Sequence, residues 1–524
     1  MEDSFLRFLR DKTPRISCSF FISPEDNSGC KSKLFRIFVD SILPRQLTHH
    51  SNNQIFNTTP TDMNYDVIVI GSGPGGYVAA IKSAQLGMKT AVVERENLGG
   101  ICLNWGCIPT KALLKSAQVY NYINHAATYG VSAQPAEADL AAMVARSRGV
   151  AETMSKGVQF LLKKNNVDVI SGTGKVLPGK KVEVTNAEGV ATVYEANHII
   201  IATGARSRNL PNLPQDGKKI IGYRQAMTLP EKPNTMVVVG SGAIGSEFAF
   251  FYQSIGVQVT LVEFMPNVVP NEDEDVSAQI SRSFRKMGMK VMTSASVEKV
   301  DIDGDICHVT IQSKKGTEVV DADIVLSAVG VVTNLEGIGL EEVGITTERT
   351  KIVVDDYYRT NVEGYYAIGD VVHGPALAHV ASAEALVCVE KIAGLDPQPV
   401  NYSNIPGCTY TTPEVASVGM SEKKAREAGY EVLVGKFPFT ASGKATAAGN
   451  RDGFIKMVID AKTDQILGAH FCGDNVTEMI SGIVAARQNG LTAKQVASAI
   501  HPHPTMSESI MEAIEQAYGK AVHL

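Results

Sequence analysis

The feature that most constrains this chain is a glycine-rich turn that occurs twice, each time between a short apolar run and a helical stretch. The first copy is Gly-Ser-Gly-Pro-Gly-Gly at residues 71–76, and the second is Gly-Ser-Gly-Ala-Ile-Gly at residues 240–245. An acidic residue follows each turn at the same spacing, Glu94 in the first copy and Glu263 in the second. Equal spacing in an equal context predicts two dinucleotide-binding units in one chain.

Each glycine of such a turn has its own task. The first permits a tight turn, the second lets a pyrophosphate approach the backbone, and the third lets the following helix, predicted over 77–86 in the first copy, pack on the sheet. The helix N-terminus faces the phosphates, and the acid accepts a hydrogen bond from a ribose hydroxyl. The expected nucleotide-binding residues are therefore Gly71, Gly73, Gly76 and Glu94 in the first unit, and Gly240, Gly242, Gly245 and Glu263 in the second.

Glu263 also selects the nucleotide of the second unit. A carboxylate at this position accepts from a free 2′-hydroxyl and repels a 2′-phosphate, which NADP sites meet with an arginine. The residues after Glu263 are Phe264, Met265 and Pro266, with no arginine among them. The second unit is predicted to bind NAD.

Composition excludes several other classes of protein. The 524 residues exceed one hydrophobic core and suggest about three or four compact units. A formal charge of −6 offers no basic surface for nucleic acid. No apolar run reaches the roughly 18 residues of a membrane helix. Eight cysteines are too few for a disulfide framework.

Only two of the cysteines, Cys102 and Cys107, lie close together in the sequence, and the other six are expected to be inert. Cys107 stands just ahead of a helix predicted over 111–123, whose N-terminal partial charge favours a thiolate. Zinc is the competing interpretation, but a zinc site usually needs four ligands, and the sequence has no second pair at suitable spacing. The pair therefore indicates redox chemistry, and no metal site is predicted.

Residues 1–62 differ from the rest of the chain. They lack the continuous apolar stretch of a secretory signal, and the early acids Glu2, Asp3 and Asp11 argue against a mitochondrial presequence. We expect this segment to be a disordered leader or an upstream mis-called start, and the protein to be cytoplasmic. The alternative is a targeting leader for the mitochondrial matrix.

Residues 99–111, which contain both clustered cysteines, resemble the redox-active disulfide motif of the pyridine nucleotide–disulfide oxidoreductases. The resemblance covers roughly 63–524. It implies FAD in the first unit, a Cys102 that exchanges with the substrate disulfide, and a Cys107 thiolate that forms a charge-transfer contact with FAD. It also implies that Lys111 and Glu247 form an ion pair near the reactive edge of the flavin.

Further stretches resemble the same family. Residues 201–205 resemble the point where the chain leaves the FAD unit, 366–370 resemble its return, and 377–379 resemble the start of a flavin-side helix. Val331 and Val332 depart from the pattern, because many relatives have arginine there, and the polar contacts at this edge of the NAD site stay undefined. The implied FAD contacts are Gly174, Thr203, Gly204, Asp370, Ala378 and His379, and the further NAD contacts are Val297 and Gly330.

Near the end of the chain, residues 501–508 resemble the family's histidine–proline–threonine…glutamate signature. The resemblance implies that His503 takes the substrate thiol proton, that Glu508 orients it, and that the pair serves the partner subunit of a homodimer. Thr505 and Glu508 also fit a capping box for the terminal helix, and we expect Glu508 to have both roles. The local alternative is that capping alone explains Glu508 and that His503 is a plain turn residue.

Within this family, two features favour protein-bound dihydrolipoamide as the substrate. Residues Lys520–Leu524 contain no second redox pair, and the second unit is predicted to bind NAD. The expected partners are the lipoyl domains of 2-oxoacid dehydrogenase or glycine cleavage complexes. The alternative from another class is a non-catalytic flavoprotein subunit that only docks in a larger complex.

The expected fold is α/β, with two Rossmann-like dinucleotide-binding domains and a C-terminal α+β dimerisation domain. The predicted ranges are 63–206 for FAD, 207–336 for NAD, 337–404 for a central domain completing the FAD site, and 405–524 for the dimer interface.

Overall fold

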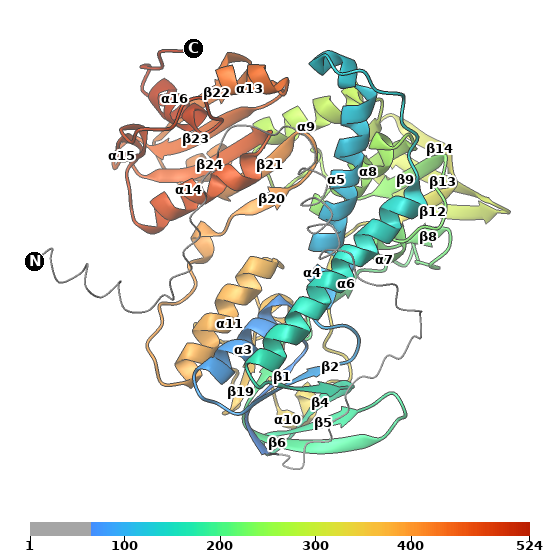
Figure 1. Cartoon of the computed structure of the whole chain (residues 1–524), viewed down its shortest axis with the longest axis vertical. Helices are drawn as coiled ribbons and strands as arrows, with labels where there is room; N and C mark the ends of the chain where they lie inside the picture. Colours follow the sequence, from blue (N-terminus) through green and yellow to red (C-terminus); the bar gives the residue numbers. More distant parts are fainter. Residues whose placement is uncertain (1–63) are drawn as a thin grey trace, which may run out of the picture. The chain divides into compact units, whose positions relative to one another are not determined.

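A computed structural model describes residues 64–524 (Figure 1). The expectations for residues 1–62 lie outside this range. None of the helices within 64–524 is long and apolar enough to cross a membrane.

The first sheet is built around the strand that precedes the first glycine turn. Its order is β3-β2-β1-β6-β5-β4, with β19 also pairing β6. The strands β3, β2, β1, β6 and β19 pair in parallel, whereas β4, β5 and β6 pair antiparallel. β1 is mostly buried because apolar side chains pack on both of its faces, as expected for a parallel strand. The bounds are β1 Asn64–Ile70, β2 Thr90–Glu94, β3 Asp168–Ser171, β4 Thr173–Leu177, β5 Lys181–Thr185, β6 Ala191–Ile201 and β19 Tyr365–Ala367.

The second sheet repeats the parallel part of the first. Its order is β11-β10-β9-β15-β8, so the strand before each glycine turn occupies the same place in its own sheet. A separate antiparallel sheet, β12-β13-β14, corresponds to the antiparallel strands of the first unit. The bounds are β8 Ile220–Ile221, β9 Thr235–Val239, β10 Gln258–Glu263, β11 Lys290–Thr293, β12 Ala295–Asp303, β13 Ile306–Ser313, β14 Gly316–Ala322 and β15 Ile324–Ser327. The prediction of two α/β dinucleotide-binding units is confirmed.

Helices from distant parts of the sequence cover the first sheet. α3 (Pro74–Gln85) begins three residues before the predicted helix, because Pro74 is well suited to a first helical position. It lies beside α11 (Ala378–Ile392), and a Cβ on Gly75 would lie 3.2 Å from the Ala381 carbonyl oxygen (Figure 1). The segment around α11 therefore belongs to the wall of the first unit.

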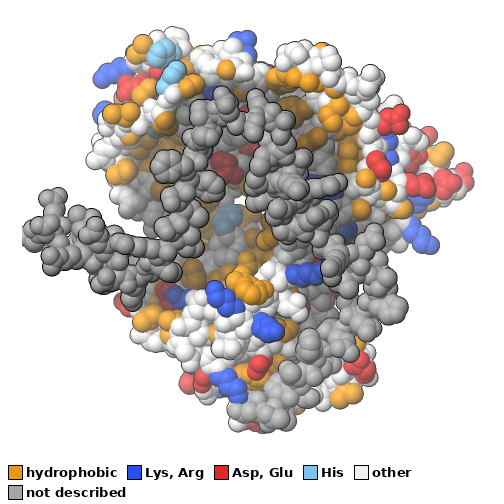
Figure 2. All heavy atoms as spheres, in the orientation of Figure 1, with side chains coloured by type: hydrophobic (Ala, Val, Ile, Leu, Met, Phe, Trp, Pro, Cys, Tyr) orange, Lys and Arg blue, Asp and Glu red, His pale blue; other side chains and the backbone are white. Residues whose placement is uncertain are grey.

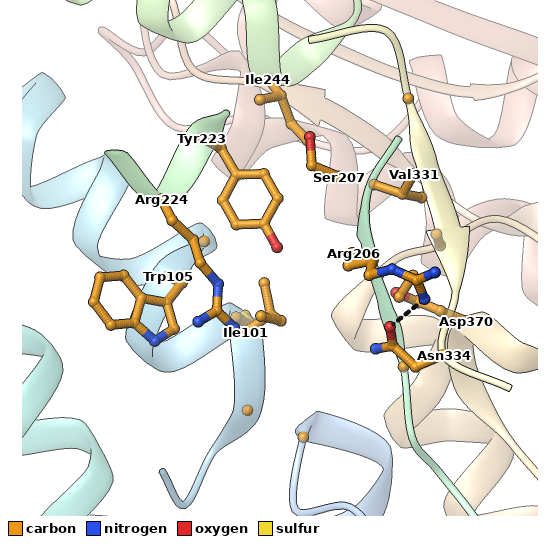
Figure 3. Close-up of a pocket in the computed structure, with 18 of the residues that line it drawn as sticks. Ile101, Trp105, Arg206, Ser207, Tyr223, Arg224, Ile244, Val331, Asn334 and Asp370 are labelled. Atoms are coloured by element: carbon orange, nitrogen blue, oxygen red, sulfur yellow. Dashed lines mark hydrogen bonds between the residues drawn. The ribbon is translucent and has the colours of Figure 1, made fainter. Parts of the chain in front are cut away.

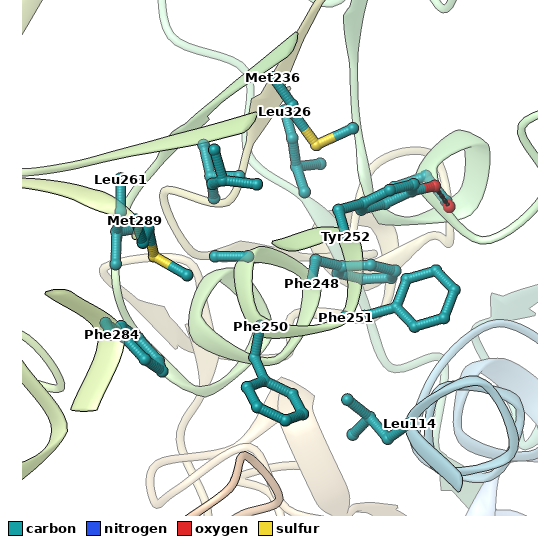
Figure 4. Close-up of a cluster of buried hydrophobic side chains, with 14 of the residues drawn as sticks. Leu114, Met236, Phe248, Phe250, Phe251, Tyr252, Leu261, Phe284, Met289 and Leu326 are labelled. Atoms are coloured by element: carbon teal, nitrogen blue, oxygen red, sulfur yellow. Dashed lines mark hydrogen bonds between the residues drawn. The ribbon is translucent and has the colours of Figure 1, made fainter. Parts of the chain in front are cut away.

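A large apolar core joins the cysteine-bearing segment to the second unit. α5 (Cys107–Asn124) contributes Leu113 and Leu114, and α8 (Ala243–Ser254) contributes the run Phe248–Tyr252 (Figure 4). These side chains are nearly inaccessible to solvent, so their burial fixes α5 against α8. The packing determines where polar residues on the two helices meet.

The C-terminal region is an antiparallel sheet with helices on it, in the order β20-β21-β24-β23-β22. α16 approaches β22 so closely that a Cβ on Gly435 would lie 1.7 Å from the Ala513 carbonyl oxygen. This region confirms the predicted α+β domain. The bounds are β20 Gly407–Thr409, β21 Glu414–Gly419, β22 Val432–Pro438, β23 Phe454–Asp460, β24 Ile466–Gly473, α12 Glu422–Glu427, α13 Gly443–Ala448, α14 Val476–Gln488, α15 Ala493–Ala497 and α16 Glu508–Ala517.

The remaining elements connect these layers. They are α4 Gly100–Trp105, α6 Leu140–Lys164, α7 Tyr223–Ala226, α9 Glu274–Lys286, α10 Leu340–Val343, β7 Ala205–Ser207, β16 Val331–Thr333, β17 Thr347–Glu348, β18 Lys351–Ile352, and the 3₁₀ helices η1 Ala126–Tyr129, η2 Gly369–Val371, η3 Tyr402–Asn404 and η4 Phe439–Ala441.

Candidate active site

One continuous cavity of about 1310 Å³ reaches both glycine turns and both clustered cysteines. Figure 3 shows part of its wall. Because both turns open into the same space, two dinucleotides bound there would meet beside the cysteines. The predicted site residues in its lining are Gly71, Gly73, Gly76, Glu94, Cys102, Cys107, Lys111, Gly174, Thr203, Gly204, Gly240, Gly242, Glu247, Glu263, Val297, Gly330, Asp370 and Ala378. Gly245, His379, His503 and Glu508 lie outside it.

The first glycine of each turn has a backbone conformation that favours glycine. Gly71 has φ +98° and Gly240 has φ +96°. A Cβ on Gly71 would lie 2.3 Å from the Ala202 carbonyl oxygen, and a Cβ on Gly240 would lie 2.5 Å from that of Ala328. Each turn therefore fits tightly against the neighbouring strand end.

The second and third glycines differ in their surroundings. A Cβ on the third, Gly76 or Gly245, would lie 1.9 Å from the carbonyl oxygen of the first glycine of its own turn. The second, Gly73 or Gly242, has no atom within 4 Å of the Cβ position. The turns thus combine tight packing with open space at the N-terminus of a helix, which is the arrangement that a pyrophosphate requires.

The two acids are held in the same way. Glu94 Oε2 accepts from the Ser72 backbone N–H at 3.0 Å and from its hydroxyl at 2.6 Å. Glu263 Oε2 accepts from the Ser241 backbone N–H and hydroxyl, both at 2.7 Å. Sequence reasoning quoted these serines but gave them no role, although the second position of both turns is serine. They fix each carboxylate beside its turn.

Gly106 separates the helices that carry the two cysteines. Cys102 lies in α4, and Cys107 is the first residue of α5, slightly inside the helix rather than ahead of it. The Cys107 side chain is exposed and lines the cavity. Within residues 64–524, no group of three or more histidines, cysteines or acids is arranged to hold a metal ion.

The two thiols have opposite acid–base tendencies. The hydrogen bond that Cys102 donates to Cys107, together with burial, raises the pKa of Cys102 well above the usual value for a thiol. The same hydrogen bond lowers the pKa of Cys107 to about 7; burial opposes this shift and the Lys111 charge supports it. Cys107 is therefore the thiol that readily becomes a thiolate, as a nucleophilic or electron-donating sulfur must.

Lys111 lies one helical turn after Cys107 and forms an ion pair with Glu247 of α8. Its Nζ is 2.9 Å from both carboxylate oxygens. Glu247 is buried and also accepts from the Tyr410 backbone N–H at 3.0 Å. The α5–α8 packing brings this pair together across 136 residues of sequence.

A second ion pair, absent from the sequence predictions, joins the two units beside α4. Arg224 Nη1 and Nη2 donate to the two oxygens of Glu96 at 2.7 and 3.0 Å. The Arg224 guanidinium lies 5.2 Å from the centre of the Trp105 ring, and the Tyr223 ring projects into the cavity beside it (Figure 3). The hydrogen bonds from Arg224 hold the pKa of Glu96 below its usual value. No local motif marks these residues, which explains why sequence reasoning missed them.

Val331 and Val332, where the family resemblance led us to expect an arginine, lie in β16, which pairs with β7. Val332 stands opposite Arg206, whose Nη1 donates to Asn334 Oδ1 at 3.0 Å (Figure 3). The hydrogen bond from Arg206 also helps to lower the pKa of Glu336 to about 2. A cation is thus present at this edge of the cavity, but on the neighbouring strand.

Asp370 lies in η2, where the chain returns to the first unit. Burial raises the pKa of its carboxyl group. The preceding Gly369 N–H donates to buried Glu384 at 2.6 Å, which holds the turn in place. Ala378 begins α11 and faces the cavity, whereas His379 turns its Nε2 to the Pro406 carbonyl at 3.0 Å.

His503 lies outside the cavity of its own chain. Its Nδ1 is 2.8 Å from Glu508 Oε1, and its side chain is 80% exposed. Glu508 accepts from the Thr505 backbone N–H at 2.7 Å, but the Thr505 hydroxyl donates to the Pro502 carbonyl, so only half of the predicted capping box forms. Figure 2 shows histidine side chains on the outer surface over the C-terminal elements. His503 is therefore available to another molecule.

The two glycine turns and the cysteine pair in one cavity define a class of protein, and the comparison with known families identifies the same class. The chain belongs to the pyridine nucleotide-disulphide oxidoreductase family, whose model matches residues 65–385. The dimerisation domain of the same family matches residues 405–514. The resemblance drawn from residues 99–111 is confirmed.

Individual relatives narrow the class. A dihydrolipoyl dehydrogenase of Zymomonas mobilis is 48% identical over 462 residues, covering 88% of this chain and 99% of the relative. A mitochondrial dihydrolipoyl dehydrogenase of Pisum sativum is 42% identical, with coverages of 88% and 92%. Among solved structures, LpdA from Mycobacterium tuberculosis superposes with a TM-score of 0.80 at 30% identity, covering 86% of this chain and 99% of that one.

Proposed function

We propose that this enzyme oxidises protein-bound dihydrolipoamide to lipoamide and reduces NAD⁺ to NADH, with FAD as its resident cofactor. The observation that carries the proposal is the single cavity in which Cys102 and Cys107 lie between two nucleotide-binding turns. The named activity of the relatives from Zymomonas mobilis and Pisum sativum supports the same substrate. The non-catalytic alternative has no use for a thiol that readily forms a thiolate.

The two turns suit the two dinucleotides in different places. In the first unit, the open space at Gly73 suits the FAD pyrophosphate, Glu94 its ribose, and Asp370 the ribityl region, with Gly174, Thr203, Gly204 and Ala378 in the same wall. In the second, Gly242 and Glu263 suit NAD, with Val297 and Gly330 beside them. When bound, FAD supplies the two-electron relay between the cysteine pair and NAD. This assignment divides the chain at 63–206, 207–336, 337–404 and 405–524.

The cysteine pair carries the exchange with substrate. A substrate thiolate attacks Cys102 Sγ of the Cys102–Cys107 disulfide, which breaks the disulfide and leaves Cys107 as a thiolate. The second substrate thiol then displaces Cys102 from the mixed disulfide, releasing lipoamide and the reduced pair. Lys111 stabilises the Cys107 thiolate, because its charge lowers the pKa of that group.

The proton of the attacking substrate thiol needs an acceptor, and the cavity lining within residues 64–524 contains no histidine. His503 is exposed, oriented by Glu508, and part of the segment that matches the family's dimerisation domain. We therefore assign this role to His503 of the partner subunit in a homodimer. In this assignment, His503 is the base and Glu508 is the carboxylate that orients it.

The partners that fit this activity are lipoyl domains of 2-oxoacid dehydrogenase or glycine cleavage complexes. The compartment must contain such lipoylated proteins, and we keep the cytoplasm as the expected site, with the mitochondrial matrix as the alternative. Fractionation of cells that carry a tagged full-length chain would distinguish the two compartments.

Purified enzyme tests the function directly. With dihydrolipoamide and NAD⁺, absorbance should report NADH formation, and NADP⁺ should be used at least about tenfold less efficiently. Oxidised glutathione with NADPH serves as the comparison substrate pair. No NADH from dihydrolipoamide, together with turnover of glutathione, would contradict the proposal.

A further inference from the structure

Tyr410 lies where the C-terminal region meets the Lys111–Glu247 ion pair. It follows β20 directly, and its backbone N–H donates to Glu247 Oε1 at 3.0 Å. Its ring centre is 4.3 Å from Lys111 Nζ. One residue therefore contacts the anion through its backbone and the cation through its side chain.

The ring restricts a side chain that is otherwise mobile. A lysine ammonium sits on a flexible four-carbon stem, and the Lys111 side chain is still 33% exposed. An ammonium over an aromatic face is attracted by the ring's negative quadrupole, and the attraction grows as water is excluded. Burial raises the pKa of Tyr410 to about 12, so the ring stays a neutral phenol at neutral pH.

We propose that Tyr410 is a positioning residue, whose ring and backbone N–H hold the Lys111–Glu247 pair beside Cys107 and thereby set the reactivity of that thiol. The proposal deepens the proposed function and rests on it. It gives the C-terminal region a task in its own chain, in addition to the task of His503 in the partner.

The direction of the effect follows from the charges that face these groups. The Lys111 charge lowers the pKa of Cys107, and the Glu247 charge raises it. If Lys111 moves away, Cys107 loses a cation and faces a less compensated carboxylate, so both changes raise its pKa. Three groups face Cys107: Cys102 from α4, Lys111 from its own helix and Glu247 from α8. The groups that face Tyr410 are Lys111, Glu247, Cys408, Glu414 and Glu478. Tyr77 faces Cys102.

The test compares Tyr410→Leu, which removes the ring face, with Tyr410→Phe, which removes only the hydroxyl. Both keep the backbone N–H. The readout is the pH dependence of Cys107 alkylation by iodoacetamide in the reduced holoenzyme, followed by mass spectrometry. We expect the Leu variant to raise the apparent pKa of Cys107 by about half a unit or more, and the Phe variant to match the wild type.

A double-mutant cycle shows whether Tyr410 acts through Lys111. In a Lys111→Met background, Tyr410→Leu should no longer shift the alkylation profile. Tyr410→Met, with an unbranched side chain, replaces the Leu variant if that protein fails to retain FAD. An unshifted profile in the ring-free variant, an equal shift in the Phe variant, or a shift that persists in the Lys111→Met background would overturn the proposal.

Alkylation does not depend on substrate turnover, which separates this inference from the proposed function. The same preparations are assayed with dihydrolipoamide and NAD⁺. A wild-type enzyme without this activity would remove the proposed function, whereas the alkylation profiles decide the role of Tyr410 on their own.

Discussion

The two glycine turns have nearly the same backbone but differ in how closely the following segment packs over them. Over the first turn, the Gly99 N–H donates to the Ser72 carbonyl at 3.0 Å, and a Cβ on Gly100 would lie 2.6 Å from Gly73 Cα. The second turn has the corresponding hydrogen bond, from the Val269 N–H to the Ser241 carbonyl at 3.1 Å, but its Gly242 is exposed, whereas Gly73 of the first turn is half-buried. The close approach of Gly100 to Gly73, and not the turn backbone, makes the difference.

This difference matches the two roles that the function requires. The segment that closes the first turn continues into α4, which carries Cys102, and the Glu96–Arg224 pair fastens this region to the second unit. A closed site retains a resident cofactor beside the thiols. An open site suits a nucleotide that must leave after each turnover.

The largest expected effect comes from matched substitutions at the third glycines. Gly76→Ala should abolish FAD retention and activity, because the new Cβ would lie 1.9 Å from a carbonyl oxygen within the closed turn. Gly245→Ala should keep FAD and lose NAD-linked turnover. Flavin-to-protein absorbance ratios and NADH formation measure the two outcomes. The control is Gly149→Ala, where no atom lies within 4 Å of the Cβ position. Equal loss of flavin in the first two variants would remove the distinction between the sites.

Substitution of the two thiols should separate their roles at the closed site. Cys102→Ser should lower turnover by on the order of 1000-fold or more, but keep FAD and the long-wavelength absorbance of a thiolate beside it. Cys107→Ser should lose both turnover and that absorbance. Cys408→Ala, which alters a third thiol in the cavity wall, is the control and should change turnover by less than about twofold. Absorbance that survives in Cys107→Ser and vanishes in Cys102→Ser would reverse the assignment.

Exchange of the acids should affect only the nucleotide of the same unit. Glu263→Arg should lower kcat/KM for NAD⁺ by about 10- to 100-fold and raise kcat/KM for NADP⁺, because the guanidinium forms an ion pair with the 2′-phosphate. Glu94→Arg should weaken FAD binding and leave the preference for NAD⁺ unchanged. Steady-state kinetics with both nucleotides check this prediction. A wild-type enzyme that prefers NADPH would show that Glu263 does not select the nucleotide.

The pH dependence of the thiolate is a smaller effect. With a pKa of Cys107 of about 7, lowered from the ordinary thiol value, the thiolate is present above that pH and lost below it. The long-wavelength absorbance of the reduced enzyme should therefore fall as pH drops through about 7. Lys111→Met should move the midpoint upward. A midpoint at the ordinary thiol value of about 8.5 would mean that the environment does not stabilise the thiolate.

The sequence predicts features that depend on local chain geometry. The turns at Gly71 and Gly240, their acids, and the cysteine-bearing helix are encoded within short windows, since spacing and residue type suffice to define them. Two helices begin a few residues earlier than the sequence predicted, because Pro74 and Cys107 both fit inside the first turn of a helix.

The sequence does not predict contacts made by distant segments. Arg224 meets Glu96 across 128 residues, and Tyr410 meets Glu247 across 163 residues. These contacts follow from the packing of α5 on α8 and of the C-terminal region beside them, which no local pattern describes. The position of His503 outside its own cavity likewise depends on the folded chain.

Trp105 tests most directly the claim that the closed turn holds the flavin beside the cysteines. It is the single tryptophan of the chain, lies between Cys102 and Cys107, and faces the cavity, so all tryptophan emission reports on this position. We expect the emission to be strongly quenched in the holoenzyme, to rise when FAD is removed, and to change little when NAD⁺ is added. Emission that stays unchanged after verified removal of FAD from folded protein would contradict the account.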